Sequence, residues 1–160
     1  MSDCDTAMLR RASMDFLARR EHSAHELKQK LLQKFPNVAE SVINFTLDQL
    51  KKDNLQSDTR FAESYSRYRK NRGFGFLLIK RELAIRRIAL NIVEKYVFPD
   101  DDAWVESATR ILSKSRNIGA AKATGSKAHL KLLRHLRSRG FLASQIDAAV
   151  REFANLHPSR

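Results

Sequence analysis

The sequence is poor in the residues that several fold classes require. It has one cysteine among 160 residues, Cys4, which excludes an internal disulfide and a cysteine-rich zinc site. Five glycines and three prolines are too few for the many tight turns of an all-β sandwich. No apolar run reaches the roughly 18 residues of a membrane span, and the first residues lack the apolar segment of a signal peptide. We therefore expect a cytoplasmic protein with no membrane contact.

Residue patterns with catalytic or metal-binding chemistry are also missing. His22 and His25 are three residues apart, but no further candidate ligands cluster with them. Gly73-Phe74-Gly75 lacks the Lys-Ser/Thr pair and the strand context of a phosphate-binding loop. The carboxylates fall at helix caps or exposed helix positions, without a pair placed for acid–base catalysis. The sequence therefore predicts a binding protein, not an enzyme, with no cofactor and no metal.

What the sequence does contain is helix-forming residues at helical spacing, so we predict an all-α fold. Ser23 and Glu26 form a predicted capping box, in which each side chain satisfies the other's free amide. Ser57-Asp58 is the predicted N-cap of a helix whose buried face carries Phe61, Ala62, Tyr65 and Tyr68. Stacking of the two tyrosines on nucleic-acid bases is the alternative to a core position. Five predicted helices have bounds at 6–20, 58–72, 89–97, 127–139 and 144–156.

The apolar pattern repeats along the chain, with offsets of 52 and 53 residues between its first positions. The corresponding positions are Leu27, Leu31 and Phe35, then Ile79, Leu83 and Ile88, then Leu132, Leu136 and Phe141. A unit of three helices in about 50 residues buries its apolar faces poorly alone, so neighbouring units are expected to stack. We predict three tandem three-helix repeats, residues 1–56, 57–99 and 100–160, in an elongated, curved array.

Positive charge is concentrated in the second and third repeats. The whole chain carries +12, of which 1–56 contributes +1, 57–99 contributes +6 and 100–160 contributes +5. Between Glu106 and Asp147 the sequence has nine Lys or Arg and no acidic residue. A surface charged only for solubility does not need this segregation, so the pattern predicts a polyanionic partner.

Three cations of the predicted helix 127–139 form a stripe opposite its leucines. Lys127, Lys131 and Arg134 follow i, i+4, i+7 spacing, and Arg137 and Arg139 flank them. Like charges at this spacing repel, and an anionic partner offsets that repulsion. A solvated helix face is the alternative interpretation.

Over nearly its whole length the sequence resembles the RecX family of bacterial recombinase regulators. The motifs that carry the resemblance are Leu17-Ala18-Arg19-Arg20-Glu21-His22-Ser23, Glu26-Leu27, Asp58-Thr59-Arg60-Phe61-Ala62-Glu63, Arg72-Gly73-Phe74-Gly75 and Arg139-Gly140-Phe141. Two positions depart from the family pattern: Phe76 stands where a proline is usual, and Ser57 where an acidic residue is usual.

The resemblance implies a monomeric three-repeat protein that binds RecA. Such a protein lies in the groove of the RecA filament on DNA and reduces strand exchange, ATP hydrolysis and coprotease activity. The basic surface is expected to contact RecA, single- or double-stranded DNA, or both. The residues predicted to make these contacts are Arg67, Lys70, Arg72, Lys80, Arg81, Lys127, Lys131, Arg134 and Arg137. The alternative is a stand-alone basic DNA-binding module with helix-turn-helix-like units.

Overall fold

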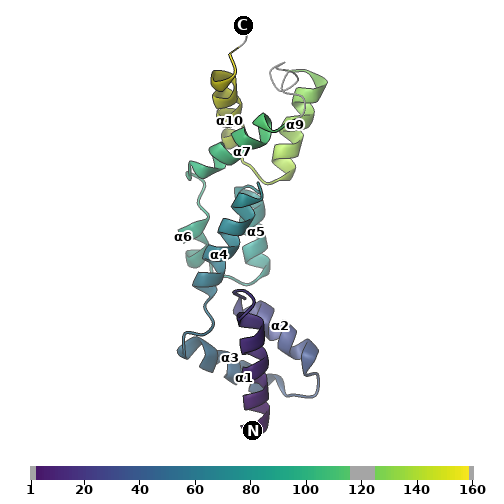
Figure 1. Cartoon of the computed structure of the whole chain (residues 1–160), viewed down its shortest axis with the longest axis vertical. Coiled ribbons are helices and arrows are strands. Elements are labelled where there is room, and N and C mark those ends of the chain that lie inside the picture. Colours follow the sequence, from purple (N-terminus) through teal and green to yellow (C-terminus); the bar gives the residue numbers. More distant parts are fainter. Residues whose placement is uncertain (1–2, 116–124, 159–160) are drawn as a thin grey trace. The chain divides into compact units, whose positions relative to one another are not determined.

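The computed structural model describes residues 3–115 and 125–158, and every regular element in these ranges is an α-helix (Figure 1). The all-α prediction is therefore confirmed for the described chain. None of the described helices has the length and apolarity that a membrane crossing needs. The nine helices found there are α1 (Asp3–Leu17), α2 (Ala24–Lys34), α3 (Glu40–Lys52), α4 (Asp58–Asn71), α5 (Phe76–Ile85), α6 (Leu90–Tyr96), α7 (Ala103–Ser113), α9 (Lys127–Ser138) and α10 (Ala143–Leu156).

Serine side chains cap the first turn of three described helices, and two of these caps, Ser23 and Ser57, are predicted from the sequence, whereas Ser126 of α9 is not. The Ser23 hydroxyl accepts a hydrogen bond of 3.0 Å from the Glu26 amide at the start of α2. The Ser57 hydroxyl accepts one of 3.2 Å from the Arg60 amide at the start of α4. Each bond satisfies an amide that the first helical turn leaves without a partner.

The described helices pack into two compact units. Unit 1 comprises Met1–Tyr65 and Leu83–Val93, and unit 2 comprises Ser66–Glu82 and Glu94–Arg160. Both units therefore contain residues of α4, α5 and α6.

In unit 1 the core forms where α1, α2 and α3 pack against one another. Leu9, Leu27, Leu31, Ile43 and Leu50 are all fully buried there. Full burial of such a side chain contributes about 1.5–3 kcal/mol, so this three-helix cluster is the main source of stability for the first repeat.

In unit 2 the core centres on Trp104 and on the packing of α7 against α10. The Trp104 side chain is fully buried, and its indole N–H donates a 2.7 Å hydrogen bond to the Phe98 carbonyl. Phe76 meets the indole edge-on, with 6.2 Å between ring centroids. The burial of Trp104 thus leaves no unsatisfied polar group on that side chain.

The predicted internal repeat is visible in the backbone hydrogen bonds that end α5 and α9. The Ile88 amide bonds the Leu83 carbonyl at 3.1 Å, and the Phe141 amide bonds the Leu136 carbonyl at 3.3 Å. Both are the outer bond of a Schellman motif. Corresponding residues of the two motifs, Leu83 and Leu136 or Ile88 and Phe141, are 53 positions apart in the sequence. The residue before each amide has a positive φ, 59° at Arg87 and 92° at Gly140.

The prediction that Tyr68 belongs to the core is wrong. Tyr68 is 52% exposed, whereas Tyr65 is half-buried and Phe61 is fully buried. Beyond Phe61 the buried face of α4 follows Ala62 and Ser66 at i, i+4 spacing, which turns Tyr68 toward solvent.

Candidate functional site

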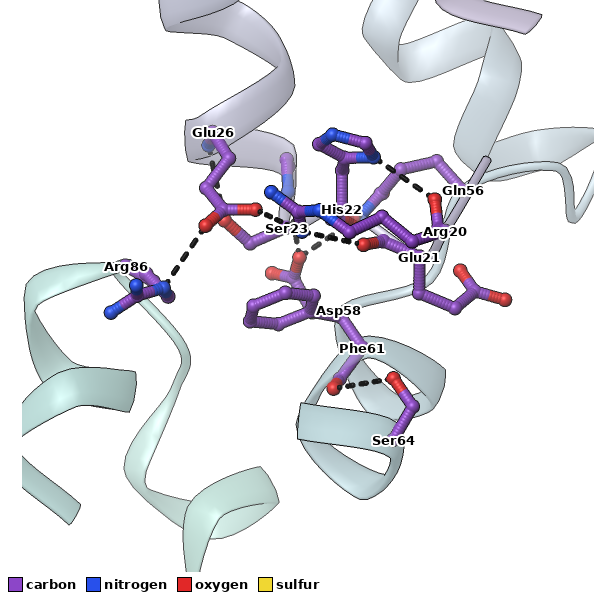
Figure 2. Close-up of polar contacts among 11 residues, drawn as sticks. Arg20, Glu21, His22, Ser23, Glu26, Gln56, Asp58, Phe61, Ser64 and Arg86 are labelled. Atoms are coloured by element: carbon purple, nitrogen blue, oxygen red, sulfur yellow. Dashed lines mark hydrogen bonds and ion pairs between the residues drawn. The ribbon is translucent and has the colours of Figure 1, made fainter. Parts of the chain in front are cut away.

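Several residues of the first two motifs form a polar network at the beginnings of α2 and α4 (Figure 2). The Asp58 carboxylate accepts hydrogen bonds from the Ala24 amide at 2.9 Å and from the Gln56 side chain at 3.0 Å. The Arg60 guanidinium lies 2.8 Å from the Glu21 carboxylate. The Ala24–Asp58 and Glu21–Arg60 contacts join residues more than thirty positions apart, so this part of the motif set stabilises the packing within unit 1.

Glu26 takes part in the same network, but not as the predicted capping box requires. Its carboxylate pairs with Arg20 and Arg86, each at 3.0 Å, and the Arg86 guanidinium also lies 4.5 Å from the centre of the Tyr65 ring. Figure 2 shows the Arg86 side chain pointing toward the Glu26 carboxylate. The second half of the capping-box prediction is therefore wrong, because two arginines compete successfully with the Ser23 amide for the carboxylate.

His22 is buried beside this network. Its Nδ1 lies 3.0 Å from the Arg20 carbonyl, which can only accept, so Nδ1 carries the proton. Burial, followed by the positive charge of Arg20, lowers the pKa of His22. Across the described residues no three His, Cys, Asp or Glu side chains lie together as metal ligands would.

The remaining glycine motifs meet in unit 2. The Gly75 amide donates a 2.7 Å hydrogen bond to the Arg139 carbonyl, and the Leu77 amide donates one of 2.9 Å to the Gly140 carbonyl. A Cβ on Gly75 would lie 2.4 Å from the Phe141 nitrogen, so a side chain does not fit there. Exposed residues outside these buried contacts are therefore the better candidates for binding a partner.

Charge distinguishes the two units clearly. Unit 2 holds eighteen Lys or Arg against eight Asp or Glu, a formal charge of +10, whereas unit 1 holds twelve against ten. All nine residues predicted to contact a partner lie in unit 2. The charge segregation predicted by repeat is thus also a segregation by packing unit.

The predicted stripe on α9 is exposed. Lys127, Lys131 and Arg134 all face solvent, as does Arg137, while Leu136 of the same helix is fully buried. Within the described chain no salt bridge joins any of these four cations to an acidic side chain. Their charge is therefore available to an external anion.

Lys70 is held by internal partners in unit 2. Its ammonium lies 2.6 Å from the Asp101 carboxylate and 4.5 Å from the Trp104 ring centre. Burial alone would raise the pKa of Asp101, but hydrogen bonds from Lys70 and from the Ala103 amide, with the Lys70 charge, lower it overall. Lys70 thus has a structural role that its position in the sequence does not reveal.

The other four predicted residues lie on α4, just beyond its end, and on α5. Arg67, Arg72 and Arg81 are exposed, and Lys80 is half-buried with its ammonium 5.6 Å from the Phe76 ring centre. Arg72 donates a 2.9 Å hydrogen bond to the Tyr68 hydroxyl.

The structure also brings together cations that the sequence analysis did not select. Arg110 of α7 and Lys114, just beyond its end, line one pocket with His135 of α9, with Arg139, just beyond the end of α9, and with Arg72. Within each pair the two residues are four positions apart, and this i, i+4 spacing is a signal that could have identified them from sequence.

The comparisons with known proteins all point to the same family. The family model "RecX, first three-helix domain" matches residues 10–50, and "RecX, second three-helix domain" matches residues 57–96. Regulatory protein RecX of Vibrio parahaemolyticus is 32% identical over 147 residues, 91% of this chain and 91% of that protein. Regulatory protein RecX of Mannheimia succiniciproducens is 36% identical over 132 residues, 82% of this chain and 84% of that protein.

Solved structures share the fold. The crystal structure of RecX from Lactobacillus salivarius superposes with a TM-score of 0.81 at 24% identity, covering 96% of this chain and 99% of that one. A second crystal structure, of regulatory protein RecX, gives a TM-score of 0.73 at 19% identity over 90% of this chain and 70% of that one.

Proposed function

The chain belongs to the RecX family of regulatory proteins, and from this premise we propose that it inhibits the RecA recombinase. It binds in the groove of the RecA filament on DNA and reduces strand exchange, DNA-dependent ATP hydrolysis and coprotease activity. It acts as a cytoplasmic monomer without enzymatic activity, organised as repeats 1–56, 57–99 and 100–160.

One observation supports this proposal most directly: unit 2 has a formal charge of +10. A filament of protein on DNA is a polyanion with a regular surface, so a strongly basic unit is attracted to it and repeated helices give it an extended contact. The exposed α9 stripe, together with Arg67, Arg72, Lys80 and Arg81, supplies charge for contacts with DNA phosphates or acidic RecA side chains. Lys70 contributes less, because Asp101 neutralises it.

The decisive experiment measures RecA activity directly. RecA is assembled on single-stranded DNA, and its ATP hydrolysis and strand exchange are followed while the protein is added up to one copy per RecA subunit. We expect both activities to fall as the protein is added. Unchanged ATPase and strand exchange at equal stoichiometry would overturn the assignment.

A stand-alone DNA-binding module is the second candidate, favoured by the unpaired exposed cations of α9. Such a module binds duplex DNA without RecA, and the logarithm of its affinity falls with log salt at about −0.9 per phosphate contacted. Binding to RecA–DNA filaments, free RecA and naked DNA, measured side by side, separates the two functions. Equal affinity for filament and naked DNA, with no effect on RecA, favours the module.

A further inference from the structure

A small pocket in unit 2 has several cationic side chains in its lining, beside apolar surface. Its volume is about 190 Å³, and it opens between the end of α4, the last turns of α7 and the last turns of α9. Its lining residues are Asn71, Arg72, Gly73, Ser107, Arg110, Ile111, Lys114, His135 and Arg139.

The lining has several positive charges and no negative one. Arg110 of α7 and Lys114, just beyond its end, stand one turn apart, and Arg72 and Arg139 also line the pocket. In the described part of the chain no salt bridge joins Arg110 or Lys114 to an acid. The nearest acid in the sequence is Glu106, one turn before Arg110 on α7, and within the described residues no salt bridge joins these two side chains. Like charges gathered in one concave site repel, and an anion bound among them relieves that repulsion.

Backbone geometry fixes the α4 side of the pocket. Gly73 has a φ of 77°, and a Cβ there would lie 3.2 Å from the Ile111 Cδ1 atom, so glycine permits the close approach to α7. The Phe74 amide bonds the Arg69 carbonyl at 3.1 Å, closing α4 with a Schellman motif. This rigid end positions Arg72 at the pocket before any ligand arrives.

Arg139 is held in place from two directions. One of its guanidinium nitrogens donates a 3.0 Å hydrogen bond to the Arg72 carbonyl, and its guanidinium carbon lies 4.7 Å from the centre of the Phe74 ring. An arginine has five N–H donors, so this single hydrogen bond leaves donors for a ligand. A cationic group already held in position loses less entropy on binding.

We propose that this pocket binds one phosphate group of a nucleic-acid backbone. At about 30 Å³ per water molecule, 190 Å³ holds roughly six waters. That is below the ~300 Å³ of the smallest typical small-molecule pockets, so the site accepts a phosphate with some water, and not a whole nucleotide. Guanidinium groups suit phosphate oxygens because they donate two parallel hydrogen bonds. The choice of DNA as the source of the phosphate rests on the proposed function.

Inorganic phosphate tests the pocket by itself. It is titrated into the ¹⁵N-labelled full-length protein at constant ionic strength, with chloride as the balancing anion. We expect saturable shifts of the Gly73, Ser107 and Arg110 amides, which the variant Arg110→Gln/Lys114→Gln loses. The control Lys95→Gln/Arg151→Gln removes the same charge from exposed positions of unit 2 outside the pocket, and it keeps the shifts. Absent or non-saturable shifts in the wild-type protein would overturn the phosphate site.

A single-stranded oligothymidylate then distinguishes a backbone phosphate from a free one. Each phosphate contact on single strands contributes about −0.7 to the slope of log affinity against log salt. We expect the pocket variant to make this slope shallower by about 0.7 and the control variant to leave it unchanged. Saturable binding of inorganic phosphate with identical slopes in all three proteins would overturn the nucleic-acid assignment.

These readouts do not involve RecA. A wild-type protein that binds phosphate and the oligonucleotide through the pocket but leaves RecA activity untouched refutes the proposed function alone. A protein that inhibits RecA but gives no pocket shifts refutes the phosphate site alone.

Discussion

Gly75 and Gly140 are in direct backbone contact in unit 2. A Cβ on Gly75 would lie 2.5 Å from the Gly140 carbonyl carbon and 2.4 Å from the next backbone nitrogen. The carbonyls of Arg139 and Gly140 in turn accept hydrogen bonds from the first amides around the start of α5. Helix α5 therefore begins without a side-chain cap of its own, because the end of α9 satisfies those amides.

Substitution of Gly75 by alanine should destabilise the protein by roughly 1–3 kcal/mol or more, because the added methyl group meets rigid backbone. The free energy of unfolding is measured by urea denaturation. Gly125→Ala is the control: it adds the same group where no atom lies within 4 Å, and its φ of 80° costs about 1–2 kcal/mol. A smaller loss at Gly75 than at Gly125 would contradict the close contact.

The Asp101 carboxylate should make stability depend on pH in the acid range. Its folded-state pKa lies below the ordinary value of 3.8, so the unfolded chain binds the proton more tightly. The resulting stabilisation is complete above about pH 5 and is lost as the pH falls through the folded-state pKa. Asp101→Asn should cost about 1–3 kcal/mol at neutral pH and lose less stability than wild type on acidification, as measured by denaturation between about pH 7 and 2.

Asp100→Asn provides the matched control for that experiment, since Asp100 is an exposed carboxylate next to the same helix. It should keep the wild-type acid profile. Identical profiles for Asp101→Asn and wild type would show that the Lys70–Asp101 pair does not contribute to acid sensitivity.

Arg87 has a left-handed backbone conformation, with a φ of 59°, where glycine is favoured. Arg87→Gly should therefore stabilise the protein by about 0.5–1 kcal/mol, the relief of strain being partly offset by greater freedom of the unfolded chain. Thermal unfolding measures the change. Arg87→Ala removes the same charge but retains the Cβ, so it should give no stabilisation, and an equal gain in both variants would point to charge instead.

Charge reversal on α9 tests the stripe. Replacing Lys127, Lys131 and Arg134 with Glu should preserve helicity, because all three side chains are exposed, and should weaken RecA inhibition about tenfold or more. Inhibition is measured as the protein concentration that halves RecA ATPase activity at physiological salt.

The control for the stripe reverses three exposed cations of unit 1, Arg11, Arg19 and Lys52. Both triple variants have the same net charge, so a difference between them reports position on the molecule. If the unit 1 variant is equally impaired, net charge governs binding and the α9 stripe has no special role.

Local signals in the sequence were sufficient for much of the fold. Leu31, Ile43, Leu83 and Leu136 are all fully buried, because helical periodicity determines which side of a helix is apolar. The Ser23 cap is equally local, since its donor lies three residues away.

Contacts between distant residues could not be predicted in this way. Glu26 and Arg86 are 60 residues apart, and Lys70 and Asp101 are 31 apart, so these pairs exist only after the helices have packed. The α9 stripe could be predicted from the residue spacing within one helix. The pocket lined by Arg72, Arg110 and Arg139 could not, because these residues come from three separate segments of the chain. Sequence patterns thus identified exposed cations better than they identified their partners.

The formal charges of the two units, +10 and +2, have a kinetic consequence. Long-range attraction to a polyanion scales with charge, so unit 2 is drawn toward it about five times more strongly than unit 1 when both are equally distant. Under the proposed function, collisions with the RecA–DNA filament are therefore expected to begin through unit 2, and unit 1 is expected to make contact afterwards. Added salt slows this first step and has much less effect on contacts that form later through uncharged groups.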